Sequence, residues 1–264
     1  MKIDLAGRTA LITGSTAGIG YAAAQALALA GASVVVNGRN EKRVAEAVEQ
    51  IREATGSDTV TGIAADVATA EGANDLIAAL PDVDVLVNNL GIFGATPVFE
   101  IPDEEWTRYF EVNVLSGVRL ARHYTPRMVE RGWGRVIFVS SESAIQIPTE
   151  MVHYGMTKTA QIAVSRGMAQ SVAGTGVTVN TVLPGSTLTE GVREFIADRV
   201  GRDVPFDEAE RRFMEVERPT SLLKRLIRPE EIGNFIAYVA SDLSSATTGA
   251  ALRADGGIAN TLIP

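Results

Sequence analysis

The sequence has no cysteine, and this excludes a disulfide, a thiolate nucleophile and a metal site with cysteine ligands. A chain without cysteine fits a reducing compartment. Histidine is almost as scarce, because His123 and His153 are the only two and they form no H-x-H or H-x-x-x-H pair. Since such pairs are typical of protein metal sites, we expect no metal to be bound.

Long apolar runs are also missing, so no segment reaches the length needed to span a bilayer. Residues 1–8 lack the apolar region and the cleavage site of a signal peptide. A formal net charge of -8 argues against a nucleic-acid-binding surface. We therefore expect a cytoplasmic protein that binds neither membrane nor nucleic acid.

What the sequence does contain is a regular alternation of apolar runs and helical patterns. Its 264 residues suit one large α/β domain, residues 1–264. We expect strands at 8–13, 33–37, 59–65, 84–87, 135–140, 177–183 and 248–254, and helices at 19–30, 41–54, 70–80, 103–131, 151–173 and from 229 onward. Short strands rich in Val, Ile and Leu predict burial on both faces. The fold class is therefore α/β, a Rossmann-type doubly wound, seven-stranded and mostly parallel sheet with helices on both faces.

Residues 190–228 break this rhythm. The segment is rich in charge, contains Pro205 and Pro219, and shows weak helical periodicity only around 207–217. An excursion of this length from a compact sheet is typical of a functional loop. We predict that it is a lid covering the substrate.

A glycine-rich turn, residues 13–20, lies between the first expected strand and the first expected helix. Its glycines have the spacing G-x-x-x-G-x-G. Without a Cβ they permit a tight turn and close approach of a pyrophosphate, and the helix N-terminus offers free N–H groups to the phosphates. A plain turn is the alternative, but the strand–turn–helix context favours a dinucleotide site. The candidate contacts are Gly14, Ser15, Thr16, Gly18, Ile19 and Gly20.

The end of the second strand bears on which dinucleotide is bound. An NAD enzyme usually has an acidic residue there for the ribose 2′-hydroxyl, whereas this chain has Gly38 followed by Arg39. A guanidinium binds a 2′-phosphate through paired, charge-assisted hydrogen bonds. We predict that NADP(H) is favoured over NAD(H), with a solvated loop charge as the alternative role of Arg39.

Two further strand ends supply cofactor candidates. Asp66 and Val67 follow the third strand, and we expect the carboxylate near the adenine amino group. Asn89 and Gly91 follow the fourth strand, where they would line the cofactor ribose and brace the sheet. Asparagine is also an ordinary turn former, which is the alternative here.

Tyr154 and Lys158 are four residues apart in an expected helix and therefore share one face. A nearby ammonium lowers the pKa of a phenol from its ordinary value of about 10, which makes the tyrosine a proton donor and acceptor. An exposed tyrosine beside a solvated lysine has the same spacing. The choice between a catalytic pair and an ordinary surface pair therefore depends on the other motifs.

Taken together, the motifs resemble the short-chain dehydrogenase/reductase family, in its shorter form. The resemblance covers nearly the whole chain and adds Asn113 in the long helix, Ser141 after the fifth strand, Pro184-Gly185 and the closing Asp255-Gly256-Gly257. It implies an NADP(H)-dependent oxidoreductase that interconverts a carbonyl and a secondary alcohol, similar to 3-oxoacyl-(acyl carrier protein) reductases. It also implies a homotetramer.

The resemblance implies a role for each site residue. Tyr154 would be the general acid/base, Lys158 would bind the nicotinamide ribose and lower the phenol pKa, and Ser141 would hold the substrate carbonyl oxygen. Asn113 would bend the long helix and hold a water that links Lys158 to solvent. At the nicotinamide end, the implied cofactor contacts are Tyr154, Lys158, Pro184, Gly185, Thr187 and Thr189, with Thr189 on the carboxamide.

Three residues depart from the family pattern. Leu90 replaces an alanine near the nicotinamide, where it would reshape the pocket floor or fill core; Thr157 replaces a serine; and Arg253 replaces an apolar residue in the last strand, where it would face a subunit contact or the substrate. None removes a catalytic group.

The substrate itself stays undetermined by the sequence. Its side of the site is expected at 92–96, 145–151, His153 and 190–217. Alternatives to the main interpretation are a non-catalytic NADP(H)-sensing protein, which would have lost Ser141, Tyr154 or Lys158, and an NAD-preferring sugar-alcohol or hydroxysteroid-type dehydrogenase.

Overall fold

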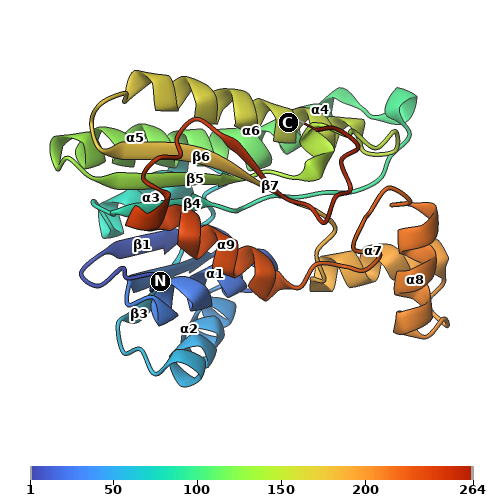
Figure 1. Ribbon diagram of the computed structural model, residues 1–264, viewed down its shortest axis with the longest axis horizontal. Helices are drawn as coiled ribbons and strands as arrows, with labels where there is room; N and C mark the ends of the chain where they lie inside the picture. Colours follow the sequence, from blue (N-terminus) through green and yellow to red (C-terminus); the bar gives the residue numbers. More distant parts are fainter. Residues whose placement is uncertain (1, 263–264) are drawn as a thin grey trace.

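The computed structural model describes residues 2–262, so Met1, Ile263 and Pro264 of the predicted domain lie outside the described residues. One seven-stranded sheet runs through the molecule in the order β3-β2-β1-β4-β5-β6-β7 (Figure 1). Its strands are β1 (Thr9–Ile12), β2 (Ser33–Gly38), β3 (Val60–Ala64), β4 (Val85–Asn88), β5 (Gly134–Val139), β6 (Val177–Pro184) and β7 (Ala251–Ala254). The predicted Rossmann-type fold is confirmed, and all six strand pairings are parallel.

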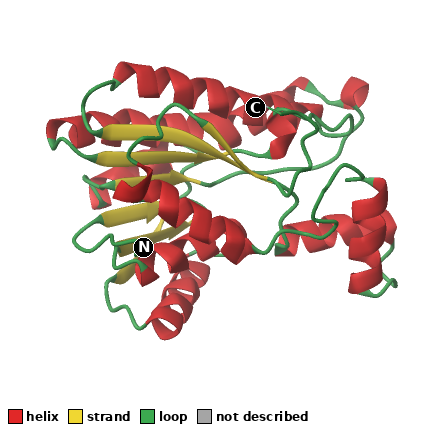
Figure 2. Ribbon diagram, viewed as in Figure 1, coloured by secondary structure: helices red, strands yellow, loops and turns green. Residues whose placement is uncertain are grey.

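Helices cover both faces of this sheet (Figure 2). One layer contains α1 (Gly18–Leu29), α2 (Glu41–Thr55) and α9 (Pro229–Ala240), and the other contains α3 (Ala70–Ala79), α5 (Ser116–Glu130) and α6 (Val152–Ser171). Side chains alternate between the layers along a strand, since Ala10 and Ile12 pack in the first and Leu11 in the second. Burial on both faces explains why the inner strands are rich in Val, Leu and Ile, whereas the edge strand β3 is largely exposed.

The long helix expected at 103–131 is interrupted at its centre. It consists of α4 (Asp103–Phe110), a π-helical segment at Glu111–Leu115 and then α5. Asn113 lies in the π-helical segment, the kind of irregularity that often marks a functional site. The local distortion expected at Asn113 is therefore present.

Residues 190–228 form two helices instead of one weak helix. The structure has α7 (Glu190–Val200) and α8 (Phe206–Val216), which stand apart from the two helical layers (Figure 1). They share a small apolar cluster of their own that includes Ile196, Phe213 and Leu226. The segment thus leaves the sheet between β6 and α9, and its action as a lid stays a prediction.

Candidate active site

Two adjoining hollows lie at the carboxyl ends of the strands, where ligands bind in open α/β sheets. The first, here called the main cavity, has a volume of about 330 Å³ and is lined by residues that include Ile19, Ser141, Tyr154 and Lys158. The second, here called the adenosine-side hollow, is lined by the ends of β2 and β3 together with the glycine turn. Gly91 and Ile92 line both, so the two hollows lie side by side.

The glycine turn has the conformation and the clearance that a dinucleotide needs. Gly14 and Gly18 have φ values of 61° and 58°, which favour glycine. A Cβ on Gly20 would lie 2.5 Å from Asn89 Nδ2 and 2.6 Å from the carbonyl oxygen of Gly14. Asn89 Nδ2 donates hydrogen bonds to the carbonyl oxygens of Thr13 (2.9 Å) and Gly14 (3.1 Å), so Asn89 holds the turn in place. The residues present therefore fit a nicotinamide dinucleotide.

Ser15 differs from the other candidates in this turn. Its hydroxyl is fully buried, donates to the carbonyl oxygen of Ile12 and accepts from the backbone N–H of Asn37. The side chain therefore ties the turn to β2 instead of facing either hollow. Gly20 likewise serves the close packing described above, whereas Gly14 and Thr16 line the adenosine-side hollow and Gly18 and Ile19 the main cavity.

The adenosine-side hollow contains the other predicted cofactor residues, Arg39, Asp66, Val67 and Gly91. It also contains Arg43, in the first turn of α2, which sequence reasoning missed. Arg43 Nη2 lies 4.0 Å from Oε2 of Glu190, and Glu190 is the first residue of α7. Leu90 lines this hollow and packs against the apolar core, so the core-filling role considered for it applies.

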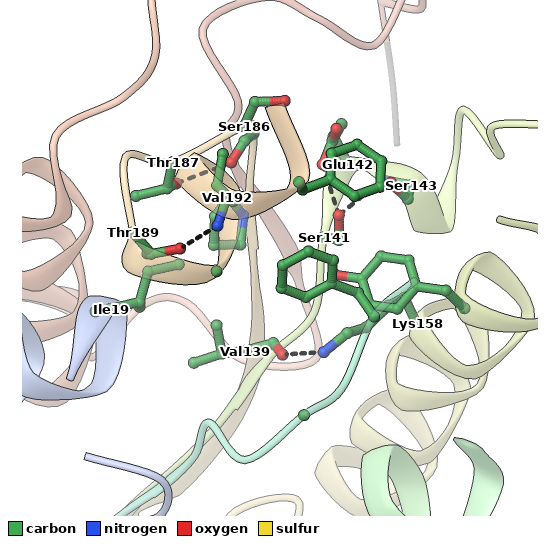
Figure 3. Close-up of a pocket in the computed structure, with 18 of the residues that line it drawn as sticks. Ile19, Val139, Ser141, Glu142, Ser143, Lys158, Ser186, Thr187, Thr189 and Val192 are labelled. Carbon is green, nitrogen blue, oxygen red and sulfur yellow. Dashed lines mark hydrogen bonds between the residues drawn. The ribbon is translucent and has the colours of Figure 1, made fainter. Parts of the chain in front are cut away.

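Ser141, Tyr154 and Lys158 meet in the main cavity because β5 ends beside α6. Ser141 is the second residue after β5 and caps the short 3₁₀ helix Glu142–Ala144. The Ser140 hydroxyl donates to the carbonyl oxygen of Lys158 (2.8 Å), which joins the strand end to the helix. Lys158 Nζ donates in turn to the carbonyl oxygen of Val139 (3.0 Å; Figure 3).

Asn113 lies behind this cavity and connects its parts. Its Oδ1 accepts from the backbone N–H of Ile92 (2.7 Å), and its Nδ2 donates to the Ile92 carbonyl oxygen and to Thr157 Oγ1, both at 3.0 Å. Thr157 Oγ1 donates to the carbonyl oxygen of Tyr154 (2.7 Å), so a threonine serves this link well. The water that Asn113 would hold for Lys158 stays a prediction.

The end of β6 and the residues just after it form one side of the main cavity. Pro184, Gly185, Thr187 and Thr189 all line the main cavity. The Thr187 hydroxyl donates to the Gly185 carbonyl oxygen (2.8 Å), and Thr189 Oγ1 accepts from the backbone N–H of Val192 as the N-cap of α7 (Figure 3). Both threonines are therefore held by the backbone at the place where residues 190–228 leave the sheet.

Burial affects the pKa of Tyr154 in the direction opposite to the one expected from Lys158. Burial, followed by the nearby Glu142 carboxylate, raises the pKa of Tyr154 above its ordinary value. Lys158 Nζ lies 5.5 Å from the centroid of the phenol ring, and burial lowers the pKa of Lys158 itself to about 7, so a lowering of the phenol pKa by Lys158 stays a prediction. Tyr154 therefore keeps its proton at neutral pH, as a proton donor must.

The buried lysine makes a testable contribution to stability. Below pH 7, Lys158 is charged in the folded and the unfolded chain, and the folded state carries the cost of a buried ammonium. Between about 7 and the ordinary value of 10.5 the unfolded chain binds more protons, so wild-type stability rises with pH. In urea unfolding, we expect the stability of Lys158→Met relative to wild type to be greatest below pH 7 and to fall up to pH 10.5. A difference independent of pH would contradict the lowered pKa.

Sequence reasoning missed a pair of charged residues in the main cavity, Glu142 and Arg218. Glu142 is only 5% exposed, and its Oε2 accepts a hydrogen bond from the Ser141 hydroxyl (2.6 Å; Figure 3). Arg218 comes from the segment after α8, and its Nε lies 3.8 Å from Glu142 Oε1. Glu142 could have been proposed from the sequence because it is adjacent to Ser141. Arg218 lies within the predicted excursion 190–228, but no motif singled it out as a cavity residue.

Several residues expected on the substrate side lie elsewhere. His153 is buried against Tyr109, with ring centroids 4.0 Å apart, and packs edge-on to Trp106. Arg253 pairs with Asp255 at 3.0 Å and donates to the carbonyl oxygens of residues 259 and 261, so it fixes the C-terminal turn. The cavity wall is aromatic, formed by Phe93, Phe195 and Phe213, which lie within the expected ranges 92–96 and 190–217.

Comparison with known proteins identifies the class. The family model described as enoyl-(acyl carrier protein) reductase matches residues 14–259. Dehydrogenase/reductase SDR family member 4 of Caenorhabditis elegans is 34% identical over 259 residues, which cover 96% of this chain and 95% of that protein. The chain belongs to the short-chain dehydrogenase/reductase family. It is an oxidoreductase that acts on CH–OH and C=O groups with a nicotinamide cofactor.

Two further relatives show the similarity of this chain, the first in sequence and the second in structure. The uncharacterized oxidoreductase YvaG of Bacillus subtilis (strain 168) is 52% identical over 263 residues, 99% of this chain and 100% of that protein. The crystal structure of L-sorbose reductase from Gluconobacter frateurii, complexed with NADPH and L-sorbose, has a TM-score of 0.92 at 32% identity. That likeness covers 99% of this chain and 100% of the other.

Two absences are noted for residues 2–262, one of grouped metal ligands and one of membrane-spanning helices. In that range, no three or more His, Cys, Asp or Glu side chains are grouped so that they could hold a metal ion. None of the helices described there combines the length and the apolar character needed to cross a membrane.

Proposed function

We propose that this enzyme interconverts a ketone and a secondary alcohol with NADP(H), and that Tyr154 is its general acid/base. The observation that carries the proposal is the shared cavity: Ser141, Tyr154 and Lys158 line the same space as the start of the glycine-turn helix. When bound, the nicotinamide supplies a hydride to the carbonyl carbon. Tyr154 donates the proton that the carbonyl oxygen then needs, so that no alkoxide has to persist.

The neighbouring residues support this assignment of roles. The raised pKa of Tyr154 keeps the phenol protonated, which is the form that reduction requires. Ser141 Oγ holds the substrate oxygen. Lys158, which shares a face of α6 with Tyr154, holds the cofactor ribose. Asn113 is a positioning residue, because its hydrogen bonds join residue 92 to the turn of α6 that carries Tyr154.

The decisive experiment is an NADPH-consumption screen over carbonyl compounds. The panel contains simple ketones, hydroxyketones, ketoses, 2-oxo acids and a 3-oxoacyl thioester, which covers the 3-oxoacyl-(acyl carrier protein) reductase-like activity implied by the family. Reduction of at least one compound is expected. NADPH binding without reduction of any compound would instead favour the non-catalytic sensor.

The preference for NADP(H) is supported by the charge around the adenosine-side hollow. Arg39, Arg43 and Arg108 line it. No acidic residue stands at the end of β2, where an NAD enzyme usually has one. The relative L-sorbose reductase is complexed with NADPH in its crystal structure.

Removing the guanidinium of Arg39 tests this preference. We expect Arg39→Ala to weaken NADPH binding by about 10- to 100-fold, because a charge-assisted hydrogen bond contributes roughly 1.5–3 kcal/mol, and to leave NADH binding nearly unchanged. The matched control is Lys42→Ala, which removes a strongly exposed cation from α2. Fluorescence titration of both cofactors measures the effect. Equal losses for NADPH and NADH would remove Arg39 from the 2′-phosphate.

Three other proposals accompany this one. Residues 190–228 act as a lid over the main cavity, which Phe195, Phe213 and Arg218 line from that segment. The chain assembles as a homotetramer, and it works in the cytoplasm as a single domain. These rest on the family resemblance and on the sequence.

A further inference from the structure

Glu142 and Arg218 form a buried charged pair that the proposed hydride transfer does not use. Glu142 is 5% exposed, and the Arg218 side chain is 11% exposed. Arg218 Nε is buried and has no hydrogen-bond partner among residues 2–262. Burying a carboxylate and an unpaired N–H next to a catalytic site is costly unless a ligand completes the set.

The hydrogen bond between Ser141 and Glu142 competes with the role proposed for Ser141. A serine hydroxyl has one proton to donate, and Ser141 donates it to Glu142 Oε2 at 2.6 Å. Ser141 Oγ also accepts from the backbone N–H of Ser143 (3.1 Å). Ser141 therefore donates to a substrate carbonyl only when another donor occupies Glu142.

A hydroxyl group next to the substrate carbonyl provides that donor. Its proton would go to Glu142 Oε2, which would release the Ser141 proton to the carbonyl oxygen, and its oxygen would accept from Arg218 Nε. Ser141 Oγ and Glu142 Oε2 are neighbours, which matches oxygens on adjacent carbons. One α-hydroxyketone would thus give Glu142 Oε2 a donor and Arg218 Nε an acceptor.

The charge of the pair also bears on which substrates are rejected. The two charges of the pair cancel, so a charged substrate would lose its hydration here without a net opposite charge to compensate it, and the pair favours a neutral polar substrate. The Arg218 guanidinium lies 5.4 Å from the ring centroid of Phe213, which holds it against the aromatic wall. A simple ketone leaves the pair without a partner.

We propose that Glu142 and Arg218 are specificity-determining residues that select a neutral α-hydroxyketone, the grouping found in ketoses, and in reverse the corresponding vicinal diol. This inference rests on the proposed function. The balance of the reaction is unchanged: NADPH gives the hydride to the carbonyl carbon, and Tyr154 gives the proton to its oxygen.

The test compares substrates that differ in one group, 3-hydroxy-2-butanone, 2-butanone and 2-oxobutanoate, with NADPH as the reductant. For the wild-type enzyme we expect kcat/KM for the hydroxyketone to exceed that for 2-butanone by about 10- to 100-fold, since the buried pair is left incomplete by the simple ketone. The 2-oxo acid should be the poorest of the three. Equal kcat/KM values for the two ketones, or a preference for the acid, would overturn the inference.

Substitution then separates specificity from structural support. We expect Glu142→Gln to reduce the hydroxyketone-to-butanone ratio by about tenfold or more, because an amide is a weaker acceptor than a carboxylate. Arg218→Met should reduce it too. The control is Glu49→Gln, which removes an exposed carboxylate on α2. A structural defect lowers both rates together and leaves the ratio unchanged, and that result would contradict the proposal.

The outcomes also distinguish this inference from the proposed function. If no carbonyl of the whole panel is reduced, the proposed function fails. If carbonyls are reduced but the α-hydroxyl makes no difference, only the present inference fails. Should Glu142→Gln not fold, the ratio measured for the wild-type enzyme decides.

Discussion

Replacing Tyr154 with phenylalanine is expected to lower kcat for carbonyl reduction by about 10²- to 10⁴-fold, the contribution typical of a general acid. The substitution removes one oxygen and keeps the ring, which packs edge-on to Phe93 with centroids 6.3 Å apart. Burial raises the pKa of this phenol, so at neutral pH it carries the proton that the product needs. Without it, the developing negative charge on the substrate oxygen would have to be met by Ser141 alone.

Single-turnover measurement of NADPH oxidation checks this expectation, with fluorescence titration of NADPH alongside it. Cofactor affinity should stay within about twofold, because the cofactor is held mainly by the glycine turn and the strand ends. Tyr238→Phe is the matched control, since this tyrosine lies on α9 and is 37% exposed. A Tyr154→Phe enzyme with undiminished kcat would show that the proton comes from another group.

Replacing Gly20 with alanine is expected to raise the Kd for NADPH by about 10- to 100-fold, because a displaced turn loses hydrogen bonds to the charged pyrophosphate that contribute roughly 1.5–3 kcal/mol. The new Cβ would lie 2.5 Å from Asn89 Nδ2 and 2.6 Å from the carbonyl oxygen of Gly14. Neither distance is a normal contact, so the glycine turn must move. That movement breaks the hydrogen bonds from Asn89 to Thr13 and Gly14 that hold the turn against β4.

Gly167 offers a control for the same substitution. It lies in α6, and a Cβ there would meet nothing within 4 Å. Gly167→Ala should leave the Kd for NADPH unchanged and stabilise the fold by about 0.5–1 kcal/mol, since alanine loses less conformational freedom in a helix. If Gly20→Ala binds NADPH as well as Gly167→Ala does, the turn is no part of the cofactor site.

The features that the sequence predicted well are those determined locally. The strands were recognisable because both faces of the sheet are covered by helices. A strand such as Ser33–Gly38 therefore contains a run of buried valines. The glycine spacing at Gly14, Gly18 and Gly20 reflects local backbone and packing requirements. Helix α7 was missed because its many charged residues obscure the helical periodicity of its apolar face, which packs mainly against α8.

The features that the sequence did not predict depend on contacts between distant segments. Glu142 and Arg218 are 76 positions apart and meet only because the segment after α8 returns over β5. The i, i+4 spacing of Tyr154 and Lys158 indicated a shared face correctly. It carried no information on burial, which raises the pKa of the tyrosine and lowers that of the lysine.

A crystal structure of the enzyme soaked with NADP⁺ tests the central claim most directly. The claim is that residues 154 and 158 face the reactive carbon of the nicotinamide ring. We expect the pyrophosphate on the glycine turn, the ribose within hydrogen-bond distance of Lys158 Nζ and C4 of the ring beside the Tyr154 hydroxyl. A nicotinamide ring turned away from Tyr154, or a dinucleotide bound away from residues 14–20, would contradict the account.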